Sequence, residues 1–408
     1  MSIWPIIRLS WKNIWRNKTR SAVVIIAVIL GTWAGTFMAA FMNGMVQQQI
    51  ETQLDNYIAH IQIHTKKYQE DELPKFYIHS ADSLLKDLQS KPFVSSITAR
   101  SVITGLASSS ASTFGVTITG VYPETEKTVS ELYTTIKEGN YFEGNARNQI
   151  VIGEKLATRL KLRLRSKIVL NFQDVNGTIS AGAFRVAGIY KSTNTSYDES
   201  HVYVRIEDLN RLIGNPDAVH EVAMKINNIE QADTLAAQIG NLNPTLSVES
   251  WGDISTTLRY ASANMDTYLY IIMVIILIAL TFGIINTMLM AVLERQQEIG
   301  MLMAIGVNKA RTFSMILSET FFLAIFGAPI GLFLAWIGIH ILSSSGVDVS
   351  AFAAGLEEYG YSSVIYPILE ADYYLNVGIL IIITTLVAAI YPSYKALKLN
   401  PVEAIRKI

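Results

Sequence analysis

The sequence contains no cysteine, which excludes disulfide bonds and any chemistry based on thiolates. It is also poor in charge: 16% of its 408 residues are Asp, Glu, Lys or Arg, where soluble proteins have about 25%. No G-x-x-x-x-G-K-[ST] motif is present, so we expect no ATPase site, and no bound ATP or Mg²⁺, in this chain. The zinc-peptidase pattern that begins at His220-Glu221 fails because Met224 replaces the second histidine. His60 and His64 have no third ligand nearby, so we expect no metal site there.

Four stretches carry no charged residue and are long enough to be membrane helices. A hydrocarbon core of about 30 Å needs roughly 20 apolar residues, and 50% of the chain is hydrophobic. The first stretch is too long to be a signal peptide, and no small-residue cleavage site follows it. The stretches are Ser21–Ile50, Thr267–Leu293, Thr320–Val347 and Tyr373–Tyr394. We therefore predict a membrane protein with four spans.

Lysine and arginine predict the orientation of these spans, because they are enriched on the cytoplasmic side. Bases without acids precede the first span: Arg8, Lys12, Arg16, Lys18 and Arg20. Bases also lie between spans two and three (Arg295, Lys309 and Arg311) and predominate after the last span (Lys395, Lys398, Arg406 and Lys407). The loop between spans three and four is acidic, with Asp348, Glu357, Glu358, Glu370 and Asp372. We predict cytoplasmic termini and an extracytoplasmic segment of about 44–266, which is large enough to fold around its own core without disulfides. A large outer domain without disulfides suggests a bacterial envelope, so we expect the chain in the inner membrane of a bacterium.

The first twenty residues have the pattern of an amphipathic helix. Arg8, Lys12, Arg16 and Arg20 recur every four residues, and tryptophans lie on the other side. Such a helix lies on the cytoplasmic membrane surface, where its bases meet anionic lipid. A simple topology signal explains the charges but not their spacing.

The extracytoplasmic segment begins and ends with helical periodicity. Apolar residues recur at helical spacing over 46–57 and 254–265, which predicts two stalk helices that pack against each other. Between them, two strand–helix–strand patterns flank a β-rich middle, so we predict an α+β domain with a β-rich insertion. The predicted strands are Tyr57–His64, Val94–Thr104, Thr117–Val121, Ile150–Ile152, Ile168–Phe172, Phe184–Ile189, His201–Val204, Glu221–Ile226 and Leu246–Ser250, and the helices are Ser80–Gln89 and Ile229–Ile239.

The loop between spans two and three, Glu294–Arg311, predicts a short helix. Glu294 and Glu298 are four residues apart, on one helical face. Gly306 is placed as a helix stop, and Gly300, which costs about 1 kcal/mol inside a helix, indicates close approach of another backbone. Two interpretations remain open from the physics alone: a docking element for another protein, or an interfacial connection.

Span three carries a small-xxx-small pair, Gly327 and Gly331, that predicts close helix packing. Glu319 is expected in the first turn of that span, where the helix dipole accommodates a carboxylate. A proton-relay role is the alternative for this residue.

The segment ERQQEIGMLMAIG resembles the coupling helix of the MacB/FtsX-type ABC transporter permeases, a family that includes the LolC and LolE permeases of lipoprotein release. Its matching residues are the charged start, Glu298-Ile299-Gly300 and Ala304-Ile305-Gly306. The middle of the chain (Gly120, 139–142, 151–157 and 184–189) and its end, with Tyr391-Pro392 and 400–406, are similar to the same family.

The resemblance implies a permease subunit that docks a separate dimeric ABC ATPase, where ATP and Mg²⁺ would bind, and pairs with a second copy or a paralogue. The implied coupling residues are Glu294, Arg295, Glu298, Ile299, Gly300, Met301, Ala304 and Gly306. The residue patterns divide the chain into segments, to which the resemblance adds the names porter-like, Sabre-like and coupling. The segments are an amphipathic helix (1–20), span one (21–45), a stalk helix (46–57), a porter-like part (58–116), a Sabre-like insertion (117–205), a second porter-like part (206–252), a second stalk helix (253–266), span two (267–293), the coupling loop (294–311), span three (312–342), an acidic periplasmic loop (343–374), span four (375–394) and a cytoplasmic tail (395–408).

The favoured substrate is a lipoprotein, passed on to a periplasmic carrier, because the chain starts directly at the permease as LolC and LolE do. A lipid-anchored substrate would enter from the membrane between two copies, and Phe37, Phe41 and Met45 are candidates for acyl-chain contact, with helix packing as the alternative. Three other functions stay open: MacB-like export of toxins, peptides or antibiotics, FtsX-like signalling to a cell-wall hydrolase, and an ATP-independent receptor. No nucleic-acid partner is expected.

Overall fold

A computed structural model describes residues 4–16, 18–142, 144 and 146–398 of the chain. The chain forms two compact units. The membrane unit comprises Met1–Met45, Asn264–Asp348 and Val364–Ile408, and the outer unit comprises Val46–Ala263 and Val349–Ser363. The predicted tail beyond residue 398 lies outside the described residues.

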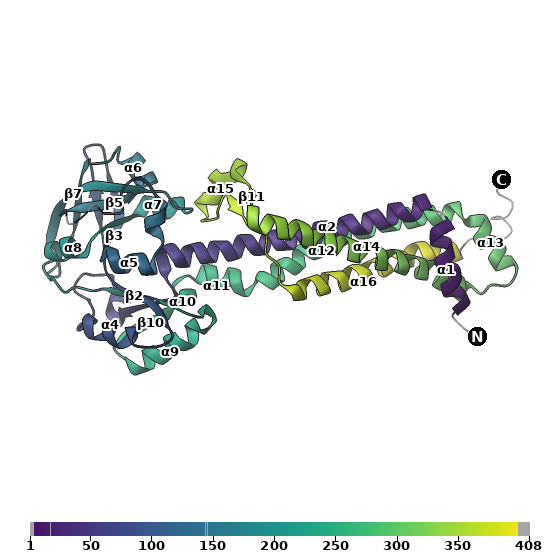
Figure 1. The fold of residues 1–408 in the computed structure, drawn as a ribbon, viewed down its shortest axis with the longest axis horizontal. Coiled ribbons are helices and arrows are strands. Elements are labelled where there is room, and N and C mark those ends of the chain that lie inside the picture. Colours follow the sequence, from purple (N-terminus) through teal and green to yellow (C-terminus); the bar gives the residue numbers. More distant parts are fainter. Residues whose placement is uncertain (1–3, 17, 143, 145, 399–408) are drawn as a thin grey trace. The chain divides into compact units, whose positions relative to one another are not determined.

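Long apolar helices make up the membrane unit (Figure 1). In the part of the chain that the structure describes, four helices are long and apolar enough to cross a membrane, as the sequence predicts. The helices of this unit are α1 (Trp4–Arg16), α2 (Lys18–Gln53, which continues into the outer unit), α12 (Met265–Glu294), α13 (Gln296–Ala304), α14 (Lys309–Ser345) and α16 (Ala371–Leu397), with a small hairpin of β11 (Val347–Asp348) and β12 (Val364–Ile365).

Close contact between α2 and α14 depends on the predicted glycine pair. A Cβ atom at Gly327 would lie 2.8 Å from Val28 Cβ, and one at Gly331 would lie 2.7 Å from the backbone oxygen of Ile29. Only glycine leaves room for this approach of two backbones. Helix α12 packs on the same part of α2: a Cβ at Gly31 of α2 would meet the side chain of Leu280 of α12. Helix α16 packs against α12 and α14.

In the described part of the outer unit, ten strands form one mixed sheet. Four of them come from two interleaved strand–helix–strand units, in the antiparallel order β10-β1-β9-β2, which matches the predicted pair of units flanking the middle. These elements are β1 (Ile61–Thr65), α3 (Lys66–Glu70), α4 (Ala81–Gln89), β2 (Val94–Ser108), β9 (Glu221–Ile226), α9 (Ala232–Leu242), β10 (Leu246–Ser250), α10 (Trp251–Ile254) and α11 (Thr256–Ala263). We call them the porter-like part.

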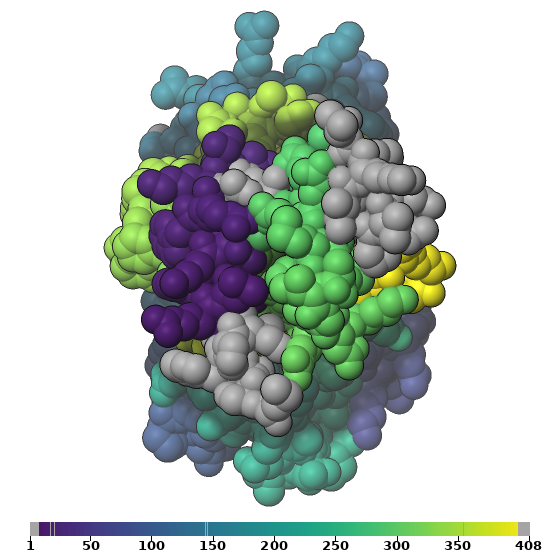
Figure 2. Space-filling model, turned by 90° about the vertical axis from the view of Figure 1, so that its right-hand side faces the viewer, coloured from purple at the N-terminus to yellow at the C-terminus, as the bar shows by residue number. Residues whose placement is uncertain are grey.

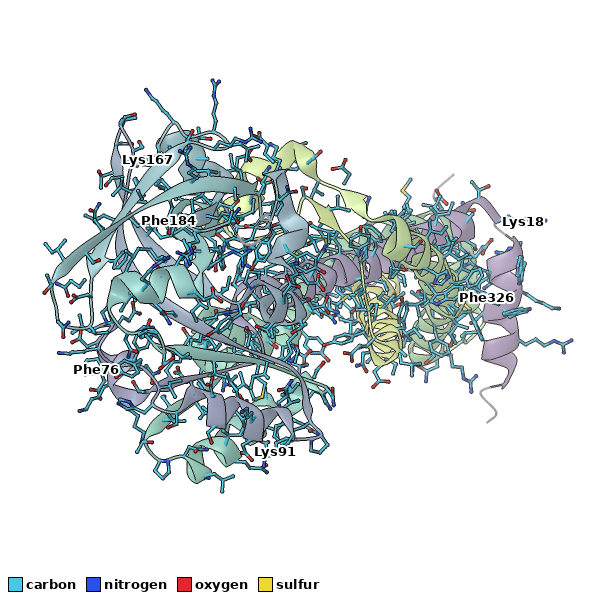
Figure 3. All side chains as sticks on the ribbon, turned by 60° about the vertical axis from the view of Figure 1, so that its left-hand side comes forward. Lys18, Phe76, Lys91, Lys167, Phe184 and Phe326 are labelled. Atoms are coloured by element: carbon cyan, nitrogen blue, oxygen red, sulfur yellow. The ribbon has the colours of Figure 1, made fainter. Side chains whose placement is uncertain are left out.

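The other strands form the β-rich part, whose core surrounds the buried side chain of Phe184 (Figure 3). Its elements are β3 (Thr113–Val121), α5 (Pro123–Val129), η2 (Leu132–Thr135), β4 (Ile136–Gly139), β5 (Gln149–Gly153), α6 (Glu154–Arg159), β6 (Lys167–Gln173), β7 (Ile179–Tyr190), α7 (Thr195–Ser200), β8 (His201–Arg205) and α8 (Ile206–Ile213). Strand β2 belongs to both parts: its first half pairs with β9 and its second half with β3. At 15 residues it is longer than the predicted strand.

Two local predictions are wrong. The predicted strand Tyr57–His64 begins only at Ile61, because Leu54–Ile58 (η1) form a π-helical turn that ends at Ala59 with φ of 62°. The predicted second stalk helix is interrupted at Ser255 and again at Asn264. Of its predicted apolar stripe, Leu258 is buried whereas Ile254, Ala261 and Met265 are only partly covered.

Candidate functional site

The predicted coupling segment contains helix α13, which is delimited at both ends by backbone geometry. Arg295 leaves the helical region, with φ of −102° and ψ of 21°, so α12 ends at Glu294 and α13 begins at Gln296. At the other end Gly306 has φ of 95°, and the backbone N–H groups of Gly306 and Val307 donate to Met303 and Leu302 at 3.2 and 3.0 Å. This is the Schellman arrangement that a left-handed glycine permits, and it matches the predicted helix stop.

The break at Arg295 overturns one prediction. Glu294 and Glu298 do not share a helical face, because they belong to different helices. Glu294 instead lines a cavity of about 590 Å³ between the ends of α2 and α12, together with Lys18 and Met290.

The remaining coupling residues divide between two sides of α13. Ile299 and Gly300 are buried, and Ile299 belongs to the core of the membrane unit. Glu298, Met301, Ala304 and Ile305 are exposed, Met301 at 58% and Ile305 at 74%. Since Glu298, Met301 and Ile305 are spaced by three and four residues, they form one stripe along the helix. We call these three residues the α13 stripe; the sequence-based set did not include Ile305.

Glu298 of the α13 stripe also belongs to a cluster of four charges that extends inward from the stripe. Arg295 donates to both carboxylate oxygens of Glu319 on α14, at 3.0 Å each, and its Nε donates to Glu298 at 3.1 Å. Arg16 on α1 also pairs with Glu298. Burial alone would raise the pKa of Glu298, but hydrogen bonds from Arg295 and Arg16 lower it. The side chains of Arg295 and Glu319 are only 14% and 10% exposed, so this pair forms the inner half of the cluster.

Glu319 does not occupy the predicted position in a first helical turn. It is the eleventh residue of α14, which begins at Lys309, and the Arg295 guanidinium rather than a helix dipole neutralises it. A buried carboxylate at this depth requires such a partner. The pairing of Arg16 with Glu298 was also not predicted, because the sequence pattern placed Arg16 only in a basic stripe that faces lipid.

Helix α1 lies against α14 and beside α13 (Figure 2). Ser10 donates to the backbone oxygen of Met315 at 3.0 Å, and the ring of Trp11 lies 5.5 Å from the rings of Phe322 and Phe326. Phe326 is labelled beside α1 in Figure 3. Helices α1, α13 and α14 are therefore joined at the end of the membrane unit that carries the α13 stripe.

The three residues suggested for acyl-chain contact lie on α2. Phe37 is partly buried among Ala335, Ile339 and other residues, and its ring stacks on Trp33 at 5.9 Å. Phe41 and Met45 are half-buried. The large apolar residues of α2 that are exposed are Val23, Ile26, Leu30, Trp33 and Met38.

The two histidines that the sequence offers as metal ligands have other partners in the structure. The Nδ1 atom of His60 accepts from the backbone N–H of Ile226 at 3.1 Å. His64 is buried, with one ring nitrogen 3.2 Å from the backbone oxygen of His220. Among the described residues, no group of three His, Cys, Asp or Glu side chains could hold a metal ion.

Two family models match the chain. A MacB-like periplasmic core domain covers residues 21–242, and an FtsX-like permease C-terminal domain covers residues 270–401. The first alone spans more than half of the sequence.

Individual relatives are distant. The chain is 25% identical to an uncharacterized ABC transporter permease of Methanocaldococcus jannaschii, over 66% of this chain and 65% of that protein. It is 25% identical to the lipoprotein-releasing system transmembrane protein LolC of Neisseria meningitidis, over 72% and 73% of the two chains. It is 26% identical to the macrolide export ATP-binding/permease protein MacB of Rhodopirellula baltica, over 66% of this chain but 35% of MacB. Among solved structures, the periplasmic region of MacB from Actinobacillus actinomycetemcomitans aligns with 52% of this chain and 98% of that region, at 13% identity and a TM-score of 0.35.

Proposed function

Because the chain belongs to the MacB/FtsX-type family of ABC transporter permeases, we propose that it is a permease subunit that extracts lipoproteins from a bacterial inner membrane by mechanotransmission. A separate ABC ATPase binds and hydrolyses ATP with Mg²⁺. The work is done on the periplasmic side of the membrane, and no solute crosses the bilayer through this chain. Both termini and α13 face the cytoplasm, in keeping with the distribution of lysine and arginine.

The ATPase docks on the α13 stripe; this surface is the observation that carries the proposal. Two large apolar side chains are exposed next to the carboxylate of Glu298: Met301 on α13, a helix of nine residues, and Ile305 directly after its end. An exposed apolar patch with a charged border is typical of a protein interface. The charge cluster that extends inward from the stripe joins α13 to α1 and α14, so a push on α13 moves these helices together.

Two coupling helices are needed, because the two ATPase subunits of an ABC transporter close on each other. We therefore propose a pair of permeases, either two copies of this chain or one copy and a paralogue. Closure of the ATPases draws the two α13 helices together. Helix α2 then carries the motion outward, since it is one unbroken helix from Lys18 to Gln53.

The proposed substrate is a lipoprotein, in keeping with the names of relatives such as the lipoprotein-releasing system transmembrane proteins LolC and LolE. Its acyl chains enter from the membrane between α2 of one copy and α12 of the other. The exposed apolar side of α2 offers the contact surface, and the half-buried Phe41 and Met45 lie further along the same helix. The extracted lipoprotein then passes to a periplasmic carrier.

The test is to purify the chain with its co-expressed ATPase in nanodiscs and to identify bound molecules by mass spectrometry. We expect triacylated lipoproteins that are released on addition of ATP and a carrier. Met301→Asp is expected to abolish ATPase binding, whereas Lys309→Ala, outside α13, leaves it intact. Binding of the ATPase to Met301→Asp at the wild-type affinity would refute the docking surface.

The MacB relatives favour export of toxins, peptides or antibiotics as the second candidate. An ATPase partner without any lipoprotein in the preparation would support that function, or FtsX-like signalling if a cell-wall hydrolase is recovered instead. Absence of any ATPase would refute the whole proposal and favour an ATP-independent receptor.

A further inference from the structure

Helix α2 ends inside the outer unit in an unusual conformation. After Gln53 the chain makes the π-helical turn η1, in which Leu54, Asn56 and Tyr57 are buried. Ala59 then adopts φ of 62°, and its N–H donates to the backbone oxygen of Leu54 at 3.0 Å. Turns of this kind recur at functional sites and persist where their surroundings hold them.

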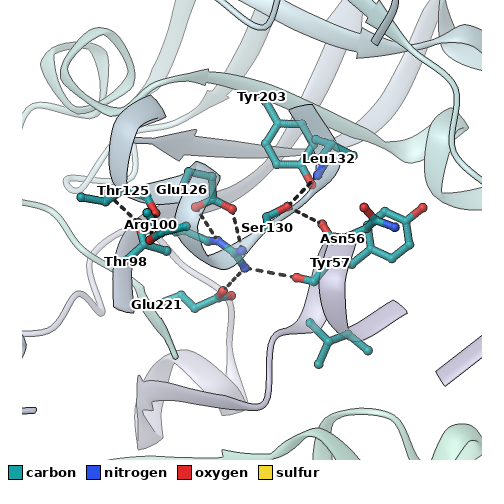
Figure 4. Close-up of polar contacts among 12 residues, drawn as sticks. Asn56, Tyr57, Thr98, Arg100, Thr125, Glu126, Ser130, Leu132, Tyr203 and Glu221 are labelled. Atoms are coloured by element: carbon teal, nitrogen blue, oxygen red, sulfur yellow. Dashed lines mark hydrogen bonds and ion pairs between the residues drawn. The ribbon is translucent and has the colours of Figure 1, made fainter. Parts of the chain in front are cut away.

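The last carbonyl groups of a helix have no partner within the helix. Here three successive ones are bound by the folded domain. Asp55 O accepts from the backbone N–H of Glu131 at 2.8 Å, and Asn56 O accepts from the hydroxyl of Ser130 at 2.9 Å. Tyr57 O accepts from Nη1 of Arg100 at 3.1 Å (Figure 4).

A fourth contact is made by a side chain of the same turn. The carboxylate of Asp55 pairs with Nζ of Lys225 on β9 at 2.7 Å. Glu131 and Ser130 follow α5 in the β-rich part, whereas Lys225 belongs to the porter-like part. The end of α2 is therefore bound by both parts of the outer unit.

Arg100 lies where β2 passes from one part to the other. In the strand register it faces Glu221 of β9 on one side and Val121 of β3 on the other. Its guanidinium donates twice to Glu126 of α5, at 2.7 and 3.1 Å, and once to Glu221 at 2.7 Å (Figure 4). All three side chains are at most 10% exposed. A buried ion triad adds little net stability but fixes geometry, because any displacement leaves a charge unpaired.

We propose that Arg100, Ser130 and Lys225 form a clamp that fixes the end of α2 to both parts of the outer unit, so that a displacement of α2 moves the two parts as one body. Arg100 is its central positioning residue. This inference rests on the proposed mechanotransmission, since without a moving α2 the clamp has no load to carry.

The clamp is tested by measuring the distance between a spin label on α2 and a spin label on α4 of the porter-like part. The chain has no cysteine, so Gln47→Cys on α2 and Lys86→Cys on α4, both exposed, give a unique labelled pair. Electron spin resonance is measured on the complex with its ATPase in nanodiscs, with labelled chains diluted into unlabelled ones. We expect one narrow distance distribution that ATP does not change.

The clamp is weakened by the double substitution Ser130→Ala/Lys225→Met, and separately by Arg100→Lys. Each hydrogen bond or partly exposed ion pair weights an equilibrium by a factor of about two to ten. The double variant should therefore populate an unclamped state roughly fivefold or more above the wild type, with a broad distribution that depends on ATP. The number of ATP molecules hydrolysed per lipoprotein released should rise by a similar factor. The control is Lys127→Met, which removes an exposed ion pair with Glu124 on α5 and should change neither readout.

A narrow distribution in the double variant, with and without ATP, would overturn the clamp, and so would unchanged ATP use per release. Should Arg100→Lys fail to fold, the double variant still decides, because it leaves the ion triad in place. The two proposals fail differently. Absence of lipoprotein release in the wild type refutes the proposed substrate, whereas the width of the distance distribution tests the clamp without any substrate.

Discussion

Replacing Arg295 is the most direct test of the charge cluster that extends inward from the α13 stripe. Its side chain and that of Glu319 are almost buried, and Arg295 is the partner that the structure gives to this carboxylate. Arg295→Met leaves the Glu319 charge uncompensated, which costs about 3 kcal/mol, the lower end of the range for buried pairs. Glu319→Leu leaves the Arg295 guanidinium with only the exposed Glu298 as partner, and we expect it to lower the free energy of unfolding by about 2 kcal/mol.

The double variant Arg295→Met/Glu319→Leu distinguishes a coupled pair from two independent effects. Replacing both members of a buried pair by apolar residues is often close to neutral. We therefore expect the double variant to be no less stable than either single variant, which corresponds to a coupling energy of at least about 3 kcal/mol. The measurement is denaturant titration in detergent, followed by tryptophan fluorescence.

The matched control is the outer pair of the same cluster. The side chains of Arg16 and Glu298 are 53% and 48% exposed, so solvent screens them and Arg16→Met should cost no more than about 0.5 kcal/mol. Single effects that simply add would refute the coupling between Arg295 and Glu319. If Arg16→Met lost as much stability as Arg295→Met, burial would not be what makes the Arg295–Glu319 pair more important than the Arg16–Glu298 pair.

Three further predictions follow from local geometry. Gly331→Val should destabilise the membrane unit by about 1 to 3 kcal/mol, because its Cβ would lie 2.7 Å from the backbone oxygen of Ile29; Gly338→Ala, whose nearest neighbour would be 3.8 Å away, is the control, and thermal unfolding in detergent compares them. Gly306→Ala should cost about 1 to 2 kcal/mol, because φ is 95° although no atom lies within 4 Å of the added Cβ. The control is Gly283→Ala, an equally open position inside a helix, where alanine should cause no loss of stability. A Gly306→Ala variant as stable as Gly283→Ala would contradict this reasoning. Burial lowers the pKa of His220 from 6.5 to about 4, against a hydrogen bond to Pro74 that raises it. The outer unit should therefore lose stability as pH falls from about 6.5 towards 4, by up to about 3 kcal/mol from this residue, and His220→Gln should remove that part of the pH dependence in urea titrations.

Local patterns predicted many of the elements, because their signals lie within a few residues. Strands β9 and β10 were predicted with their observed bounds. Helix α13 and its glycine stop were predicted for the same reason. The breaks at Arg295 and Asn264 escaped detection, because neither is a glycine or a proline and both fall within helical periodicity.

The partners in the two charge clusters could not be predicted from the sequence. Arg295 and Glu319 are 24 positions apart, and Arg100 and Glu221 are 121 positions apart, so no helical or strand spacing connects them. A single arginine in a β-strand resembles any exposed residue until the fold places a carboxylate opposite it. The π-helical turn before Ala59 was missed in the same way, because its hydrogen-bond donors come from residues 100 to 131.

Both charge clusters occur where a long helix ends, and this placement has a physical reason. Apolar packing of the kind found between α2 and α14 tolerates small sliding, because dispersion is weak per contact and has little directionality. A paired guanidinium does not slide, since its hydrogen bonds are directional and an unpaired buried charge is costly. Arg295 fixes the junction of α12 and α13 to α14, and Arg100 fixes the end of α2 within the outer unit. Under the proposed mechanotransmission, these two junctions are the places where sliding would lose the most motion, whereas the contacts along the helices can remain apolar.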